Sequence, residues 1–164
     1  MNYENHERHE IHGTHEAHGN RHSPEQRGPR KPFRLRIESP LDAETEAVIT
    51  RTIGCAIAVH TALGPGFLES IYKRAMRIEL DAQRLPYECE RAVSVAYRGV
   101  EIRGQRIDSI VENRVVVELK AVTRLDPIHE AQTISYLRTT KLRAALLINF
   151  RVPLLPQGLR RIVL

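Results

Sequence analysis

The chain has few of the residue types on which several classes of protein depend. It has no Trp, and only 5% of its 164 residues are aromatic, so its core must be built from aliphatic side chains. Cys55 and Cys89 do not have zinc-ligand spacing, and we expect them to be buried thiols rather than a disulfide. A glycine-rich phosphate loop and a Gly-x-Ser-x-Gly elbow are both missing, which argues against P-loop nucleotide binding and serine-hydrolase chemistry.

Long apolar runs are missing as well. No uninterrupted apolar stretch approaches the roughly 20 residues of a membrane span, and the N-terminus is polar throughout. We therefore expect no membrane partner, no secretory signal and a cytoplasmic location. A hydrophobic content of 41% is enough for the core of one domain, and a net charge of +5 is compatible with a nucleic-acid partner.

The first 38 residues differ in composition from the rest of the chain. His residues recur at every third position from His6 to His18, and His22 follows. Almost nothing in this segment is apolar, so we expect residues 1–38 to be a disordered tail and residues 39–164 to be one folded domain. Because neutral imidazoles bind zinc, nickel or copper, a loose metal-binding tract is the alternative interpretation of the tail.

Hydrophobic periodicity and turn residues divide the predicted domain into helices and strands. Two helices come first, three strands follow, and a third helix and a further strand complete the order, which is that of an α/β domain. The predicted helices are 42–63, 67–83 and 126–140, and the predicted strands are 90–97, 100–111, 115–120 and 144–150, with a short final strand at 160–164.

The run from Asp108 to Lys120 is the most informative part of the sequence. A hairpin loop centred on Asn113 places Asp108 opposite Glu118, with Cβ atoms about 4.5–5.5 Å apart. Side chains alternate along a strand, so Glu118 and Lys120 share a face of the sheet. Two neighbouring carboxylates repel unless one is protonated or a cation lies between them. Hard oxygen ligands suit Mg²⁺ or Mn²⁺ better than zinc, so the run predicts a divalent-metal site.

The same register also allows a purely structural interpretation. It places Arg106 opposite Lys120, so two acids and two bases could neutralise each other as a salt-bridge cluster. A one-residue bulge would also spoil the pairing of Asp108 with Glu118. Spacing alone leaves both interpretations open.

Two predicted helices carry further candidates. Glu69 and Tyr72 are three residues apart at the start of the second helix, and Gln132 and Tyr136 are four apart on the third, so each pair shares a helix face. The alternative for Glu69 is a structural role, because a carboxylate in the first turn of a helix interacts favourably with the helix dipole. Tyr72 and Tyr136 could be ordinary core residues. We expect His129 to be a surface residue.

Together these residues resemble the PD-(D/E)XK nuclease superfamily. The resemblance covers about residues 44–162 and rests on Asp108, Glu118-Leu119-Lys120 and Gln132-x-x-x-Tyr136. The segment Gly66-x-x-Glu69-x-x-Tyr72 is similar to the signature of the small prokaryotic GxxExxY proteins, which are placed in that superfamily. Ile107 stands where many members have Pro.

The resemblance implies a fold, an activity and partners. The fold would be a restriction-endonuclease-like α/β core, with a central mixed sheet flanked by helices in the order ααβββαβ. The activity would be metal-dependent hydrolysis of phosphodiester bonds in nucleic acid, most naturally DNA. Small nucleases of this type often need a second subunit to cover a duplex, so a homodimer is one expected assembly. The alternative is a non-catalytic nucleic-acid-binding or interaction module on the same fold.

The resemblance also assigns roles to the candidate residues. Asp108 and Glu118 would hold Mg²⁺ or Mn²⁺, helped by Glu69 and by the backbone carbonyl of Leu119, and Lys120 would orient water or stabilise developing negative charge. Gln132 would steady this lysine or the substrate. The residues assigned to substrate binding are Tyr136, Tyr72 and Arg106.

Overall fold

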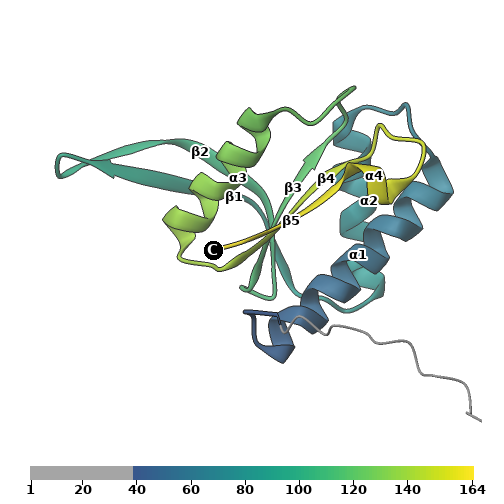
Figure 1. Cartoon of the computed structure of the whole chain (residues 1–164), viewed down its shortest axis with the longest axis horizontal. Coiled ribbons are helices and arrows are strands. Elements are labelled where there is room, and N and C mark those ends of the chain that lie inside the picture. Colours follow the sequence, from purple (N-terminus) through teal and green to yellow (C-terminus); the bar gives the residue numbers. More distant parts are fainter. Residues whose placement is uncertain (1–38) are drawn as a thin grey trace, which may run out of the picture. The chain divides into compact units, whose positions relative to one another are not determined.

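In a computed structural model, the described part of the chain, residues 39–164, forms a five-stranded mixed sheet with helices on its faces (Figure 1). The predicted His-rich tail, residues 1–38, lies outside the described residues. The predicted α/β class is confirmed, and the predicted elements occur in the predicted order, with one additional four-residue helix before the final strand. The elements are α1 (Ala43–Leu63), α2 (Glu69–Ala82), β1 (Tyr87–Tyr97), β2 (Val100–Val111), β3 (Val115–Lys120), α3 (Pro127–Thr140), β4 (Ala144–Asn149), α4 (Leu155–Gly158) and β5 (Leu159–Val163).

The sheet has the order β1-β2-β3-β4-β5, and only the β3–β4 pair is parallel. A parallel pair needs a crossover connection, and α3 supplies it. Nearly every residue of β3 and β4 is buried, because helices cover both faces of these two strands. Their continuous apolar character follows from this position at the centre of the sheet.

Each face of the sheet has its own hydrophobic core. Val117 and Leu119 of β3 pack in the cluster that includes α1 and α2, whereas Val116 packs with Tyr136 and Leu137 of α3. Because side chains alternate along a strand, residues 118 and 120 share with Val116 the face that α3 covers. The alternation therefore directs the two charged residues of β3 towards α3.

The helix α1 is 21 residues long and has the length and composition of a membrane-crossing helix, which inspection of uninterrupted apolar runs did not predict. A core helix passes the same test. Val48, Ile49, Ala56 and Val59 are at most 3% exposed and belong to the core shared with the sheet. The apolar face of α1 therefore packs in the core of the domain.

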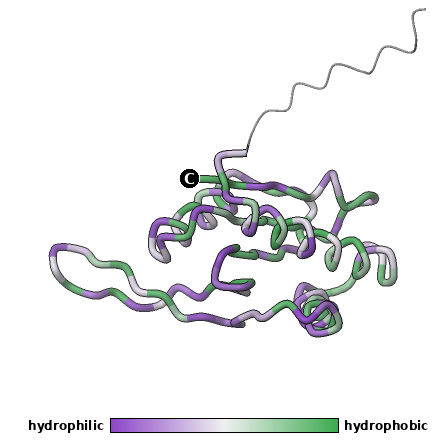
Figure 2. The backbone as a smooth tube through the Cα atoms, turned by 90° about the horizontal axis from the view of Figure 1, so that it is seen from below, coloured by the Kyte–Doolittle hydropathy of each residue, from purple (hydrophilic) through white to green (hydrophobic). Residues whose placement is uncertain are grey.

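The strands β1 and β2 extend past the rest of the sheet as a two-stranded arm (Figure 1). Hydrophilic and hydrophobic residues alternate along the arm (Figure 2). The cross-strand pairs Val95–Ile102 and Tyr97–Val100 share one face, and their side chains are 41–63% exposed. The register of the arm shifts at one bulge, where Gly104 is the extra residue opposite residues 93–94, and both strands continue through it.

Candidate active site

The candidate site lies where β2 separates from β3. The ladder between these strands follows the predicted register and ends at the pair Ser109–Val117. One step further, the Asp108 carboxylate accepts a hydrogen bond from the backbone N–H of Leu119, with 2.9 Å between Oδ2 and N. Asp108 therefore lies beside Glu118 across the two strands, as the spacing predicts.

Glu118 is almost completely buried, with 2% of its surface exposed. Its Oε1 accepts a hydrogen bond from Nζ of Lys120 at 2.6 Å, whereas Oε2 is buried and has no hydrogen-bond partner within the described residues. Burial raises the pKa of Glu118, and the charge of Asp108 raises it further, against the opposing effect of Lys120. The site thus contains one carboxylate oxygen that is shielded from water and still free to accept a cation.

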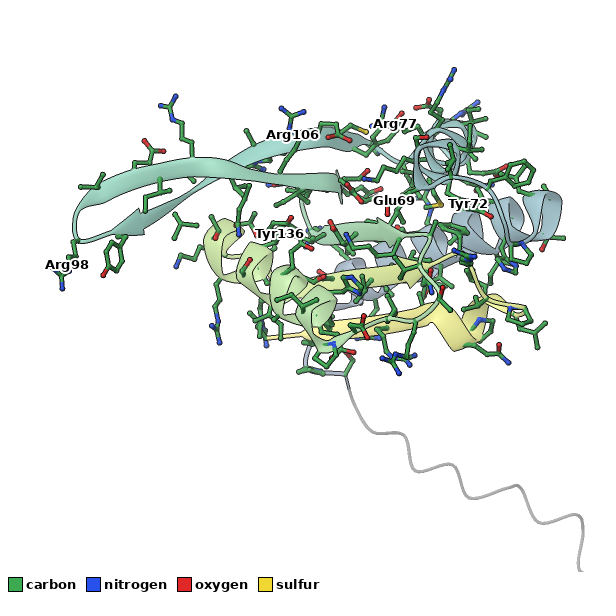
Figure 3. The ribbon with its side chains drawn as sticks, turned by 90° about the horizontal axis from the view of Figure 1, so that it is seen from above. Glu69, Tyr72, Arg77, Arg98, Arg106 and Tyr136 are labelled. Atoms are coloured by element: carbon green, nitrogen blue, oxygen red, sulfur yellow. The ribbon has the colours of Figure 1, made fainter. Side chains whose placement is uncertain are left out.

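A second lysine, Lys73 of α2, completes the charged cluster. Its Nζ lies 2.6 Å from Oδ1 of Asp108 and 2.8 Å from Oε1 of Glu69, and Figure 3 shows Glu69 between α2 and the strands. Burial disfavours the ammonium, but the hydrogen bonds to Asp108 and Glu69 outweigh burial and hold the pKa of Lys73 above its ordinary value. Lys73 was not predicted from the sequence. Its position four residues after Glu69, on the same helix face, was the available signal.

Arg106 does not occupy the predicted place opposite Lys120. Because the β2–β3 ladder ends at Ser109, this part of β2 pairs only with β1, and Arg106 lies opposite Ala92. Its side chain is 65% exposed, and its guanidinium lies 3.7 Å from Glu90. The prediction that Arg106 is the second base of the cluster is therefore wrong.

Gln132 and Tyr136 share a helix face as predicted and face the sheet. The Tyr136 hydroxyl donates to the backbone carbonyl of Arg106 at 3.0 Å and accepts from Nε2 of Gln132 at 2.6 Å. Burial raises the pKa of Tyr136, and the nearby charge of Glu118 adds to this effect. Neither side chain hydrogen-bonds Lys120 in the described part of the chain: Tyr136 contacts the backbone of β2, and Gln132 contacts the hydroxyl of Tyr136.

Tyr72 lies in the core rather than on an open surface. It is fully buried, and its ring stacks on Phe150 with 4.5 Å between ring centroids. Its hydroxyl donates to the carbonyl of Gly64 at 2.7 Å and accepts from the N–H of Phe67 at 3.2 Å. Tyr72 therefore fixes the loop before α2, and its predicted contact with substrate has no structural support.

The predicted metal ligands are held by lysines instead of being gathered around one point. Residues 39–164 contain no group of three or more His, Cys, Asp or Glu side chains placed to hold a metal. The chemistry of the donor set nevertheless fits a hard cation, because Asp108, Glu118 and Glu69 all supply oxygens and Oε2 of Glu118 has no partner. A cation that binds here must compete with Lys73 and Lys120 for the remaining oxygens.

A surface depression of about 620 Å³ follows directly after β3. Asn149 holds the adjoining loop, because its buried amide accepts from the N–H of Val122 at 3.0 Å and donates to the Val122 carbonyl at 2.8 Å. The structural role of Asn149 was not predicted. The residues that line the depression are Ala121, Val122, Thr123, Arg124, Asp126, His129 and Arg151.

The fold and the cluster together define a class of protein. A mixed sheet flanked by helices, with two carboxylates and a lysine where β2 separates from β3, is a restriction-endonuclease-like domain. The family model described as the PD-(D/E)XK nuclease superfamily matches residues 46–162, and the chain belongs to that superfamily. Comparisons with curated proteins and with solved structures give no match. Nucleases of this superfamily generally use divalent metal ions.

Proposed function

We propose that the chain is a metal-dependent nuclease that hydrolyses phosphodiester bonds in DNA, with Mg²⁺ or Mn²⁺ as its ion. The observation that supports this most is the unpartnered, buried Oε2 of Glu118, beside Asp108 and Lys120. Leaving a buried acceptor unpaired costs about 1–3 kcal/mol. A salt bridge with only a stabilising role would not need such an oxygen, whereas a cation-binding site would use it.

In this proposal Asp108 and Glu118 hold the ion, with help from Glu69 and from the Leu119 carbonyl. The bound ion would polarise a phosphoryl oxygen and lower the pKa of an attacking water. Lys120 is already positioned within the cluster by Glu118, so its ammonium can stabilise the negative charge that develops on the phosphate. Gln132 and Tyr136 position the β2 backbone next to Asp108.

We further propose that the chain is a GxxExxY protein within the superfamily. Each residue of the motif has a distinct physical role that supports this. Gly66 has a φ of +122°, a backbone conformation that residues with a side chain rarely adopt. Glu69 is the first residue of α2, and its carboxylate pairs with Lys73, which also contacts Asp108. Tyr72 fixes the intervening loop through two backbone groups.

We also propose that the protein is a cytoplasmic homodimer. The support for a dimer is the uncovered apolar face of the arm, because a two-stranded ribbon is only marginally stable without packing. Ile102→Lys should then shift the mass measured by size-exclusion chromatography with light scattering towards that of a monomer. Glu101→Lys, the neighbouring position on the other face of the same strand, is the matched control.

The second candidate is a non-catalytic nucleic-acid-binding module. It is favoured by one observation, namely that Lys73 and Lys120 already compensate much of the acidic charge. The two proposals differ in their dependence on metal. A binding module should retain its affinity for DNA when a chelator is added, whereas the nuclease should lose its activity.

The test of the proposed function is hydrolysis of single-stranded, duplex and branched DNA and of RNA by the full chain, with Mg²⁺ and with Mn²⁺. We expect the wild-type chain to cleave DNA. Both the Glu118→Gln substitution and the addition of a chelator should abolish this cleavage. If the wild-type chain cleaves none of these substrates with either ion, the proposal is wrong.

A further inference from the structure

We infer that Lys73 is a built-in counter-cation that a divalent ion must displace, and that this competition sets the metal affinity of the site. The inference rests on the proposed function, because it concerns the ion that the nuclease would use. It assigns to Lys73 a role that differs from the role of Lys120, although both lysines contact carboxylates of the same cluster.

The two oxygens of Asp108 are both engaged. Oδ2 accepts the N–H of Leu119 at 2.9 Å, and Oδ1 lies 2.6 Å from Nζ of Lys73. The donor to Oδ2 is the backbone N–H of Leu119 in β3, so freeing this oxygen would disturb the sheet. Oδ1 can be freed by the movement of one side chain, and a cation that binds Asp108 must therefore replace Lys73 there.

The same ammonium also blocks the third carboxylate. Nζ of Lys73 lies 2.8 Å from Oε1 of Glu69, so one lysine bridges two of the three predicted acidic ligands. Glu69 precedes Lys73 by four residues, which is the favourable orientation for an ion pair on a helix. The Lys73 side chain is only 23% exposed, so these pairs are screened less than ion pairs at the open surface.

Lys120 does not block the site in this way. It binds only Oε1 of Glu118 and leaves Oε2 without a partner. A cation can therefore reach Glu118 while Lys120 stays in place. Formal charges agree with a competing role for Lys73: three carboxylates and two ammonium groups leave the cluster at −1, and removing Lys73 would change this to −2.

The experiment is calorimetric titration of Mg²⁺ into the full chain, without nucleic acid, for wild type and Lys73→Met. Mg²⁺ is chosen because it prefers oxygen ligands, so the six histidines among residues 6–22 compete little for it. The matched control is Arg77→Met, which removes one positive charge from the next turn of α2. Arg77 pairs with Glu90 at 3.4 Å and not with the cluster (Figure 3).

We expect Lys73→Met to lower the Kd for Mg²⁺ by about tenfold or more, because one competing charge next to two ligands is removed. Arg77→Met should leave the Kd within about twofold of wild type. Mg²⁺ should also raise the melting temperature of Lys73→Met more than that of wild type. If the methionine variant does not fold, Lys73→Gln removes the charge while keeping a hydrogen-bond donor for Asp108, and the same decrease in Kd is expected.

An unchanged or higher Kd in the Lys73 variants overturns the inference. If wild type still binds Mg²⁺ in that case, and Glu118→Gln does not, the proposed function stands without it. If wild type and variants all fail to bind Mg²⁺ while remaining folded, both the inference and the proposed metal-dependent function are overturned.

Discussion

The carboxylate of Asp108 accepts the backbone N–H of Leu119 at the point where the β2–β3 ladder ends, with 2.9 Å between the two atoms. A side chain thus takes the place of a strand-to-strand hydrogen bond. This contact fixes Asp108 relative to the segment that carries Glu118 and Lys120. One residue is therefore expected to serve both the fold and the site.

Asp108→Ala should destabilise the fold by about 1–3 kcal/mol, because it leaves the buried N–H of Leu119 without an acceptor. Asp108→Asn keeps an acceptor oxygen and should lose less stability, although it removes the charge needed for a cation. Urea denaturation measures the difference. Equal stability of the two variants would show that the hydrogen bond to Leu119 contributes little.

Glu118→Gln should stabilise the fold at neutral pH while abolishing cleavage. Burial, followed by the charge of Asp108, raises the pKa of Glu118 above its ordinary value of 4.5, so the folded state binds this proton more tightly than the unfolded state. Its favourable contribution is present below the ordinary pKa and is lost as pH rises through the raised folded pKa. The stability of wild type should therefore fall relative to Glu118→Gln across that window.

Denaturation of both proteins at a series of pH values checks this sign. A difference in free energy that does not change with pH, or one that increasingly favours wild type as pH rises, would contradict the raised pKa of Glu118.

Tyr72→Phe should destabilise the fold by about 1–2 kcal/mol, because the carbonyl of Gly64 and the N–H of Phe67 lose their partner. The ring and its stacking on Phe150 are kept. Cleavage per folded molecule should change little, since the hydroxyl points into the loop before α2. A large loss of cleavage without loss of stability would instead support the substrate contact predicted from the sequence.

Asn149→Ala should loosen the loop that follows Lys120. The Asn149 amide binds the N–H and the carbonyl of Val122, and it also accepts from the N–H of Arg151 at 3.2 Å. Faster hydrogen exchange is therefore expected at residues 121–124, with a smaller change in α1. Unchanged exchange in this loop would mean that the packing of its other residues is sufficient to hold it.

The hairpin and its register could be predicted from the sequence because they depend on local features. The β-branched run before Glu118 favours a strand, and Asn113 occupies a left-handed position in the turn, with φ of 52°. Side-chain alternation also predicted that Glu118 and Lys120 share one face of the sheet. These features extend only over neighbouring residues in the chain.

Lys73 and Arg106 could not be placed in the same way. Whether Arg106 faces Lys120 depends on where β2 leaves β3, and the pairing of β2 with β1 beyond that point sets its position. Lys73 and Asp108 are 35 residues apart in the chain, so their contact depends on how α2 packs on the sheet. Spacing predicted the grouping of Asp108, Glu118 and Lys120, whereas tertiary packing determines the contact of Lys73 with Asp108.

Cleavage of DNA by wild type and by Lys120→Met, each with Mg²⁺ and again with a chelator, is the decisive test of the proposed nuclease activity. Lys141→Met is the matched control, because Lys141 lies at the C-terminal end of α3. We expect Mg²⁺-dependent cleavage by wild type and by Lys141→Met, and a loss of about 100-fold or more in Lys120→Met with the fold retained. Cleavage that is equal in all three proteins, or that persists in the chelator, would contradict this proposal.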